Sequence, residues 1–357
     1  MYELDRVEVW WRDHQEWLET CGYLLRPRYR RGWERPSNRE EELSRTSWVM
    51  DATRVDGFLV ALKRISPSHV TESGEERIMQ LLNSEPLASH PDNPCPTLYA
   101  VLTVPGDGNM KILVLPYLRR FDSPPFETIG EVIDFCRQAL RGLRFLHEHH
   151  IAHRDPHSMN IMLDPKNMYP SGFYTGSAHY AHRTRDFSAR AKNFTRTQRP
   201  SRYYWIDYGL SVTSSSLDAL LPYVRGGDKD IPETRENVRK ANPFAADVWW
   251  MGNLIQKHLI QRYSGLESLE PLVATMCQNR PEDRPTMAEA TAHFDDILAR
   301  LSSWRLRSLT VRRKNLLWRF LDGMPAYIAH TVTYLLTRVP ALPSAPAVDK
   351  DNGHGAE

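Results

Sequence analysis

The sequence predicts an α+β fold of two lobes, in which a small antiparallel β-sheet with one helix precedes a mainly α-helical half. Three observations lead to this prediction. Stretches rich in β-branched and aromatic residues, broken by Gly and Pro, fill residues 21–117. From Thr128 onwards, apolar residues recur at spacings of three and four, which is the period of a helix. The length of 357 residues fits one two-lobed domain, and two such halves leave a cleft between them.

The composition is that of a globular protein without a strong net charge. Hydrophobic residues make up 41% of the chain, and 46 basic residues balance 44 acidic ones, so a charged partner would have to meet a local patch. The four cysteines lie far apart with no CxxC pair, which favours a reducing compartment over a zinc site or a disulfide framework. No signal sequence or apolar run of about eighteen residues is present. We therefore expect an intracellular protein, cytoplasmic or nuclear, with no transmembrane segment.

The first half of the chain contains the predicted strands. Residues 1–20 are expected to form an amphipathic helix docked on the main body, because apolar side chains such as Trp11 and Leu18 share one helical stripe. Residues 21–117 form the smaller lobe, with strands in GYLLRPRY, SWVMDATRV, GFLVALKRI, TLYAVLTV and KILVLPYL. Its helix is predicted in GEERIMQLL, between the third and fourth strands.

The second half contains the long helices. Residues 118–300 form the larger lobe, with helical patterns in GEVIDFCRQALRGLRFLHEHH, ADVWWMGNLIQKHL and LEPLVATMCQ, and with a basic insertion at about 165–202. Residues 301–338, which include Trp304 and Trp318, predict a basic amphipathic extension. This extension could meet an anionic membrane or a partner groove, or pack back on its own domain. The Pro-, Ala- and Gly-rich residues 339–357 predict a disordered tail.

Two charged residues of the smaller lobe are candidates for holding phosphate groups. Lys63 ends the apolar strand of GFLVALK, where its ammonium could bind nucleotide phosphates. Either Glu75 or Glu76 could pair with Lys63 and fix its position. We favour Glu75, because that choice leaves the apolar residues of the helix, Ile78, Met79 and Leu82, on one inward face.

Three polar residues of the larger lobe are candidates for proton and metal chemistry. Asp155 of HRD lies just past the end of a long helix, where it could accept the hydroxyl proton of a substrate. Asn160, five residues on, could hold a metal ion. Asp207 ends the buried strand of YYWIDYGL and precedes the flexible Gly209, a placement suited to Mg²⁺, which prefers carboxylate and phosphate oxygens.

These residues, in this order, resemble the eukaryotic protein kinase superfamily, in a divergent form similar to fungal kinase-like proteins. About ninety residues separate Lys63 from Asp155. Further landmarks follow in order: IPE at 231–233 resembles the APE of the family, DVWWMG from Asp247 resembles its DVWSLG helix, and RPEDRPT contains a matching Arg284. The resemblance covers residues 20–300 and implies an ion pair between Glu233 and Arg284. It also implies a protein kinase-like fold with ATP and Mg²⁺ as cofactors.

The resemblance implies an adenine site around LVLPYL. Leu115 would be the gatekeeper, and Pro116, Tyr117 and Leu118 would form the hinge between the lobes. Pro116 has no N–H, but the family uses only a carbonyl at that position, and the N–H would come from Leu118. By the same resemblance, Ala61 and Met162 would sandwich the adenine ring.

Two departures from the family pattern stand close to the expected phosphates. The GxGxxG loop is missing, and the corresponding GYLLRPRYRRGWERP contains Arg28, Arg30 and Arg31, which could cover ATP or form an ordinary solvated strand. His157 replaces the usual Lys of the catalytic loop. An unperturbed imidazole titrates near pH 6.5, so we hypothesise that His157 is a partial, pH-dependent replacement for that cation.

Two loops suggest contacts with partners or regulation. The insertion has seven basic residues and one acidic residue from Arg183 to Arg202, which fits a solvated loop or a docking surface for an acidic or phosphorylated partner. Nucleic acid is not expected, because no binding module surrounds it. The segment LSVTSSSLDALLPYVRGGDKD resembles an activation segment, in which Thr213 and Ser214–Ser216 could be phosphorylated and received by Arg154.

Our first interpretation is an ATP-dependent protein kinase that phosphorylates Ser or Thr hydroxyls of a protein. Lys63 and Glu75 would position ATP, Asp155 would be the base, and Asn160 and Asp207 would bind Mg²⁺. The alternative is a pseudokinase, which would act as a nucleotide-binding or scaffold module, and the missing glycine loop favours it. A third possibility, a small-molecule kinase of related fold, is disfavoured by IPE, DVWWMG and DRPT together.

Overall fold

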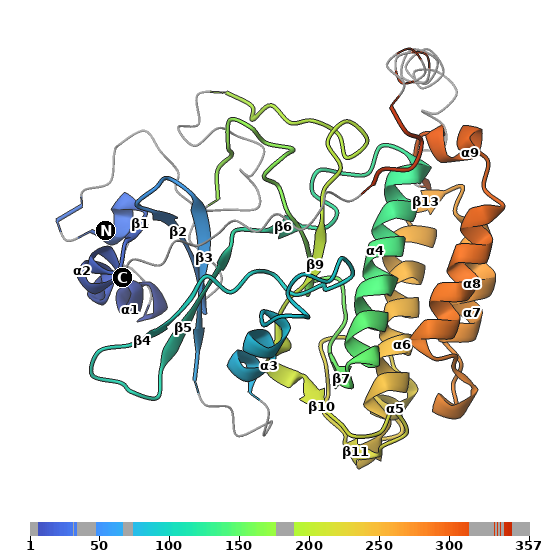
Figure 1. Ribbon diagram of the computed structural model, residues 1–357, viewed down its shortest axis with the longest axis horizontal. Helices are drawn as coiled ribbons and strands as arrows, with labels where there is room; N and C mark the ends of the chain where they lie inside the picture. Colours follow the sequence, from blue (N-terminus) through green and yellow to red (C-terminus); the bar gives the residue numbers. More distant parts are fainter. Residues whose placement is uncertain are drawn as a thin grey trace.

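The predicted fold class, an α+β two-lobed protein kinase-like fold, is confirmed by the arrangement of strands and helices. Figure 1 shows a curled sheet in the left half of the molecule and a group of helices in the right half. The computed structural model describes residues 6–30, 32–33, 48–66, 74–175, 189–313, 332, 334, 336 and 339–344.

The smaller lobe is built on a five-stranded antiparallel sheet in the order β1-β2-β3-β5-β4. Its strands are β1 (Tyr23–Leu25), β2 (Val49–Arg54), β3 (Leu59–Ile65), β4 (Ala100–Thr103) and β5 (Lys111–Pro116). In this register Ala61 of β3 pairs with Asp51 on one side and with Leu115 on the other. Because paired residues of antiparallel strands share a face, this register fixes which side chains face the larger lobe.

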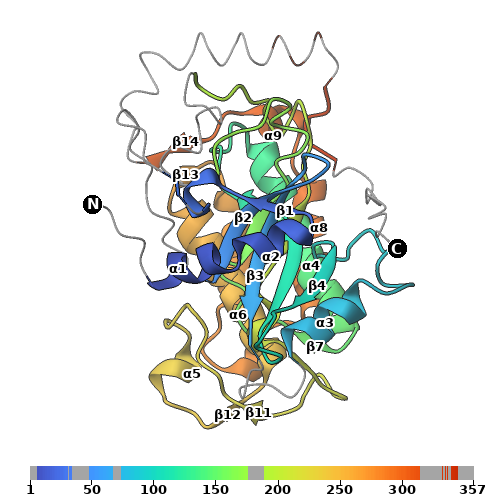
Figure 2. The same ribbon diagram turned by 90° about the vertical axis from the view of Figure 1, so that its left-hand side faces the viewer.

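Two short helices cover the outer face of the sheet, where one helix was expected. They are α1 (Arg6–Asp13) and α2 (Gln15–Thr20), with a break at His14. Figure 2 shows them lying across the strands. Trp11 and Leu18 are fully buried against outward-facing residues of the sheet such as Met50 and Leu62. The apolar stripe in the sequence therefore identified the packed face correctly, although not the break.

The helices of the larger lobe pack in a group around α4. Helix α3 (Glu75–Leu82) lies between β3 and β4 and belongs to the smaller lobe. The helices of the larger lobe are α4 (Ile129–Glu148), α5 (Pro232–Arg235), α6 (Pro243–Ile255), α7 (Glu270–Met276), α8 (Met287–Ala299) and α9 (Ser303–Arg307). Thr128 starts α4, because its hydroxyl accepts a hydrogen bond from the Glu131 N–H at 3.1 Å. Short strands connect these helices: β6 (Arg119–Arg120), β7 (Ile151–Ala152), β8 (Ile161–Leu163), β9 (Tyr203–Trp205), β10 (Val212–Thr213), β11 (Leu221–Pro222), β12 (Lys240–Ala241), β13 (Tyr263–Ser264) and β14 (Val311–Arg312).

One hydrophobic core runs from the inner face of the sheet into the larger lobe. Ile78 of α3 and Leu113 of β5 belong to the same buried cluster as Leu143 of α4 and Met251 of α6. Both lobes therefore contribute to one core, which fixes the position of α3 relative to the helices. This placement decides where the charged residues of the cleft meet.

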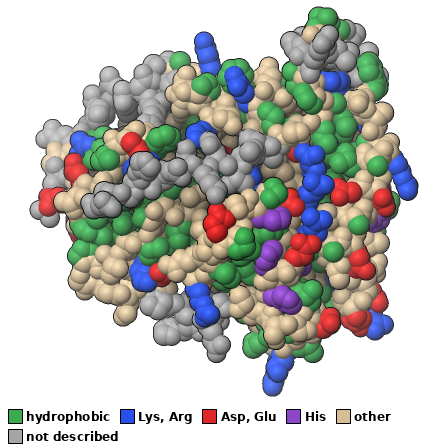
Figure 3. Space-filling view, in the orientation of Figure 1, with side chains coloured by type: hydrophobic (Ala, Val, Ile, Leu, Met, Phe, Trp, Pro, Cys, Tyr) green, Lys and Arg blue, Asp and Glu red, His purple; other side chains and the backbone are tan. Residues whose placement is uncertain are grey.

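On the face seen in Figure 3, the surface of the helical lobe has both basic and acidic side chains. On α4, Arg137 pairs with Asp134, and Arg144 lies 3.2 Å from Asp92. This pairing agrees with the near-neutral composition of the chain.

The described part of the C-terminal region packs back on the larger lobe. The N–H of Ile129 donates to Ser308 O at 2.8 Å, and β14 pairs with β13. Pro343 is buried, and its carbonyl accepts from Arg137 at 2.8 Å. Residues 339–344, expected to be disordered, therefore contact α4, because Arg137 offers a donor there. Trp318 and most of the expected amphipathic helix lie outside the described residues.

Two expectations about covalent and membrane chemistry can be compared with the structure. All four cysteines, Cys21, Cys95, Cys136 and Cys277, are free thiols. Within the described ranges, no helix has both the length and the apolar character needed to cross a bilayer.

Replacing Trp11 by Ala is expected to lower the free energy of unfolding by about 3–5 kcal/mol, because it removes a fully buried indole from between α1 and the sheet. Urea denaturation followed by circular dichroism measures this change. Trp304→Ala is the matched control, since Trp304 is 62% exposed on α9. Equal losses for the two variants would show that α1 does not belong to the cooperative core.

Candidate active site

Lys63 occupies the centre of the site and bridges two carboxylates. Its Nζ atom lies 2.6 Å from Glu75 Oε1 and 2.7 Å from Asp207 Oδ1. The three residues come from β3, from the first turn of α3 and from the segment after β9, and the structure therefore joins segments of both lobes. The side chains of Lys63 and Glu75 are 17% and 7% exposed, whereas that of Asp207 is 50% exposed and faces open space.

The local structure selects Glu75 over Glu76 as the partner of Lys63. Ile78, Met79 and Leu82 are buried as expected, which turns Glu75 inward. The N–H of Tyr208 also donates to Glu75 Oε1 at 3.1 Å. Glu76 points elsewhere and pairs with Lys111 at 2.7 Å on the surface.

Charge compensation sets the protonation of this cluster. Burial alone would lower the pKa of Lys63, but the carboxylates of Glu75 and Asp207 outweigh burial, and the pKa is raised. Burial tends to raise the pKa of Asp207, but the ammonium of Lys63 reverses this effect, and the pKa is lowered. Lys63 is therefore cationic and Asp207 anionic at neutral pH, as binding of phosphate and of a metal cation would require.

Asp155 and Asn160 form the second part of the site. Asn160 Nδ2 donates to Asp155 Oδ2 at 2.9 Å and to the Asp155 carbonyl at 3.0 Å. The other carboxylate oxygen of Asp155 accepts from the N–H of Gly227 at 2.7 Å. Burial raises the pKa of Asp155, and the Gly227 N–H and the nearby His157 oppose this effect only in part. A raised pKa makes the carboxylate a better proton acceptor.

A buried aspartate holds the loop that carries Asp155. Asp247 of α6 is fully buried and accepts from the N–H groups of His153 and Arg154, both at 2.7 Å. Its Oδ2 atom also lies 3.1 Å from His147 Nε2. Arg154 adopts φ +67°, an uncommon conformation that these bonds hold in place. The sequence marked Asp247 as a landmark but did not predict this role.

The oxygen atoms near the cluster suit a magnesium ion. Asp207 Oδ1 binds Lys63, which leaves Oδ2 for a cation, and Asn160 uses its nitrogen towards Asp155, which leaves its amide oxygen. No group of three or more His, Cys, Asp or Glu side chains suited to a metal ion occurs in the described part of the chain. The residues therefore fit an ion that takes its remaining ligands from phosphate and water, as Mg²⁺ usually does.

The predicted adenine residues lie at the other end of the cleft. Ala61 and Leu115 share the inner face of the sheet, β5 ends at Pro116, and Leu118 follows before β6. Met162 lies at the centre of β8. The backbone order therefore agrees with the expected hinge, while the role of each residue stays a prediction.

An ion pair that the sequence did not predict lies beside Ala61. Asp51 pairs with Ala61 across the sheet and shares its face. Arg26 Nε lies 3.1 Å from Asp51 Oδ1, and these side chains are 14% and 9% exposed. The surface expected to contact an adenine ring is therefore partly ionic. A signal existed in the sequence, because Asp51 interrupts the strand-like stretch SWVMDATRV.

The start of the basic insertion reaches this ion pair. Thr175 Oγ1 donates to Asp51 Oδ2 at 2.6 Å, and the hydroxyl of Tyr117 in the hinge donates to the Thr175 carbonyl at 3.2 Å. Tyr174 is 6% exposed and lies close to Arg26. Residues 173–175 thus connect the larger lobe to β2 across the hinge, a contact that no pattern in the sequence indicated.

The sequence left the roles of several basic residues open, and the structure decides three of them. Arg28 pairs with Glu8 of α1 at 2.8 Å and so cannot cover phosphates in the cleft, because it points to the outer side of the sheet. Within the insertion, Arg196 and Arg202 are 2% and 8% exposed and donate to backbone carbonyls, so these two side chains hold the loop. Arg190, Lys192 and Arg199 are exposed, and a docking surface for an acidic or phosphorylated partner stays a prediction for them. Arg31, Arg183 and Arg185 lie outside the described residues.

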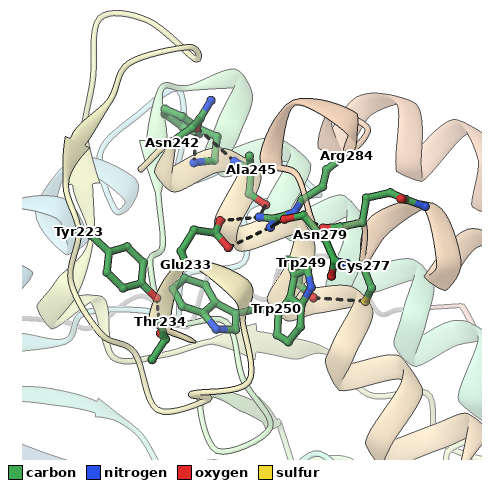
Figure 4. Close-up of polar contacts among 12 residues, drawn as sticks. Tyr223, Glu233, Thr234, Asn242, Ala245, Trp249, Trp250, Cys277, Asn279 and Arg284 are labelled. Atoms are coloured by element: carbon green, nitrogen blue, oxygen red, sulfur yellow. Dashed lines mark hydrogen bonds and ion pairs between the residues drawn. The ribbon is translucent and has the colours of Figure 1, made fainter. Parts of the chain in front are cut away.

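The activation-like segment, residues 210–230, is held near its middle, and a further anchor follows its end. Arg154 Nη2 donates to Pro222 O at 2.6 Å, so its guanidinium already has a partner, six residues after Ser216, the last of the expected phosphorylation sites. Three residues after the end of this segment, Glu233 accepts two hydrogen bonds from Arg284, of 2.7 and 2.9 Å. Figure 4 shows this pair together with Ala245 and Asn279, whose carbonyls also accept hydrogen bonds from Arg284. The predicted contact between Glu233 and Arg284 is confirmed, and both side chains are buried.

Part of the chain is similar in sequence to a known protein. No protein-family model matches the chain. A stretch of 106 residues is 35% identical to a light-sensor protein kinase from Ceratodon purpureus. The stretch covers 27% of this chain and 8% of that protein, so the chain spans less than a tenth of the relative's length.

Among solved structures, the chain is similar to the Rad53 kinase domain, determined with SCD2 in complex with AMPPNP. The TM-score is 0.41 and the sequence identity is 16%. The match covers 69% of this chain and 85% of that chain.

Glu233→Ala is expected to lower the free energy of unfolding by about 3–5 kcal/mol, because it leaves the Arg284 guanidinium buried without its carboxylate. Chemical denaturation measures the loss. Glu282→Ala is the control, since Glu282 pairs with Arg280 on the exposed surface and its removal is expected to change little. A loss no larger than that of the control would contradict a structural role for the buried pair.

Proposed function

We propose that this chain is an ATP-dependent protein kinase that transfers the γ-phosphoryl group to Ser or Thr hydroxyls of a protein. The observation that carries this proposal is the position of Lys63, within hydrogen-bonding distance of both Glu75 and Asp207. A buried ammonium held by one inward and one open carboxylate is suited to binding phosphate beside a metal ion. Phosphoryl transfer depends mainly on such positioning and charge compensation.

Each polar residue of the site has a role in this proposal. Lys63 binds nucleotide phosphates, and Glu75 keeps its side chain in place. Asp207 and Asn160 provide oxygens for Mg²⁺, which would neutralise charge that develops on the phosphate oxygens. Asp155 accepts the proton of the attacking hydroxyl, for which its raised pKa is favourable.

The surroundings of Asp155 could admit a protein side chain. A cavity of about 200 Å³ begins at Gly227, whose N–H donates to Asp155, and Asp155 itself does not line it. The cavity is lined by His157, Ser158, Gly227, Asp228, Trp250, Leu254, Lys257 and His258. Its mixed polar and apolar lining suits a peptide segment that carries a hydroxyl group. Since the four thiols are free, a reducing compartment is consistent with this proposal, and the substrate would be an intracellular protein.

The second candidate is a pseudokinase that acts as a scaffold, and one observation favours it. The Arg26–Asp51 ion pair and Thr175 occupy part of the face that would contact adenine. If these groups keep the nucleotide out, the residues around Lys63 would stabilise the fold without catalysis. Nucleotide binding therefore separates the two candidates.

The first experiment measures binding and transfer together. With ATP and Mg²⁺, the wild-type chain is expected to show a raised Tm and to incorporate radiolabelled phosphate into a generic protein substrate. Asp155→Asn is expected to keep the Tm shift but to transfer phosphate about 10²–10⁴ times more slowly, because the base is lost. Lys63→Met is expected to lose the shift, whereas its control Lys111→Met, at a surface pair, is expected to keep it.

Two outcomes would contradict the kinase. A wild-type chain that binds ATP but transfers no label would leave a nucleotide-binding pseudokinase. A chain with neither a Tm shift nor label would leave the scaffold alone.

The unexpected ion pair allows a separate test of the adenine site. The double variant Arg26→Leu/Asp51→Val is expected to bind ATP several-fold more tightly, because apolar groups pack better than an ion pair against an aromatic ring. Isothermal titration with ATP and Mg²⁺ measures the change. The single variant Asp51→Val is the control and is expected to lower the Tm, since it leaves Arg26 buried without its carboxylate. Unchanged affinity in the double variant would mean that adenine does not lie on this face.

A further inference from the structure

The segment before α5 passes directly over Asp155. Residues 224–230 lie between β11 and α5, and the Gly227 N–H donates to Asp155 Oδ1 at 2.7 Å. Asn160 donates to the other carboxylate oxygen at 2.9 Å. Both oxygens of the proposed base are therefore held by neutral N–H donors, one from its own loop and one from a segment about seventy residues later in the chain.

The two glycines of this segment leave no room for a side chain. A Cβ built on Gly226 would lie 2.6 Å from Asp155 Oδ1 and 3.2 Å from the Arg154 carbonyl. A Cβ built on Gly227 would overlap the imidazole of His157, with Cδ2 at 2.7 Å. Neither glycine is among those with positive φ. Glycine is therefore required here for close approach and not for an unusual backbone conformation.

The imidazole of His157 is itself held by this segment. Its Nδ1 atom lies 3.3 Å from the Asp155 carbonyl but 3.7 Å from the carboxylate, beyond hydrogen-bonding distance. Its other edge, with Nε2 and Cδ2, rests against Gly227. His157 therefore fills the space between the loop and the glycines, while the carboxylate is oriented by backbone and amide N–H groups.

Helix α6 anchors the glycines from the far side. The indole of Trp250 donates to Asp228 O at 3.0 Å, and Asn253 Nδ2 donates to Asp228 Oδ2 at 2.5 Å. Lys257 also binds Asp228 Oδ2, at 3.2 Å. Because α6 carries Asp247 as well, the loop of Asp155 and the segment of Gly227 are both fixed to one helix.

We infer that Gly226 and Gly227 are positioning residues: their bare backbone locks Asp155 and His157 into one rigid unit and so orients the base of the phosphotransfer proposed above. The inference rests on that proposed function for its catalytic meaning, while the lock itself is a property of the fold. The Gly227 N–H therefore orients the carboxylate of Asp155, and the His157 ring packs against Gly227 and keeps it in place. No cation at position 157 is needed for this orientation.

The test is a double-variant cycle between the loop and the glycine segment. Gly227→Ala is expected to lower kcat about tenfold to a hundredfold with the KM for ATP little changed, because displacement of the base by about 1 Å has this effect. In the His157→Ala background the same substitution is expected to cost much less, since the clashing ring is gone. Gly226→Ala is expected to remain harmful in that background, because its Cβ meets Asp155 and backbone. Gly108→Ala, at a position with open space around it, is the control.

The same variants test the lock, which is the close packing of Gly226 and Gly227 on Asp155 and His157, without any assay of activity. Gly227→Ala is expected to lower the Tm, and most of this loss is expected to disappear when His157→Ala is added. Additive Tm changes, or equal effects of His157→Ala on both glycine variants, would overturn the lock. A wild-type chain that transfers phosphate while Gly227→Ala keeps its full kcat would overturn the positioning role and leave the kinase. A wild-type chain without transfer would remove the catalytic role together with the proposed function, and the Tm cycle would then decide the lock alone.

Discussion

The contact of Lys63 with two carboxylates is the constraint on which the rest of the cleft depends. A buried ammonium is costly unless it is paired, so both Glu75 and Asp207 must reach it. For Glu75 this requires α3 to turn its apolar side into the shared core. For Asp207 it requires a left-handed backbone, at φ +64°, which only the surrounding contacts make acceptable. The charged contacts of Lys63 and the hydrophobic core shared by both lobes therefore fix the same relative position of the lobes.

Helix α6 provides a comparable constraint in the larger lobe. Its Asp247 holds the backbone of the loop that carries Asp155, and its Trp250 and Asn253 hold the segment with Gly227. The two segments that meet at Asp155 are therefore positioned from one rigid element. Rigid elements hold functional side chains more precisely than loops do. Because both segments are fixed to α6, neutral N–H groups are sufficient to hold the carboxylate of Asp155, and no cationic side chain is needed.

The sequence predicted those contacts whose two partners can be identified from residue type and from their order along the chain. Lys63 with Glu75 and Arg284 with Glu233 are opposite charges at recognisable positions, and the helical period chose between Glu75 and Glu76. The sequence could not predict the Arg26–Asp51 pair or its bond to Thr175, because these depend on strand register and on the path of a long insertion. The dipeptide Gly226–Gly227 was visible, but glycines usually indicate turns, and only coordinates show a need for space.

The Lys63 end of the cleft is suited to phosphate, whereas the hinge end has an ion pair where adenine is expected. Typical interaction energies indicate whether this ion pair would keep a nucleotide out. Release of the Thr175 hydroxyl from Asp51 would cost about 1.5–3 kcal/mol at most. A nucleotide bound with micromolar affinity gains about 8 kcal/mol, so this bond alone cannot exclude it. Arg26 need not exclude it either, because a planar guanidinium can stack on an aromatic ring while Asp51 keeps its charge compensated. The nucleotide would be excluded only if its binding had to break the buried ion pair between Arg26 and Asp51, because an unpaired buried charge is costly. A nucleotide that binds with this pair intact avoids that cost.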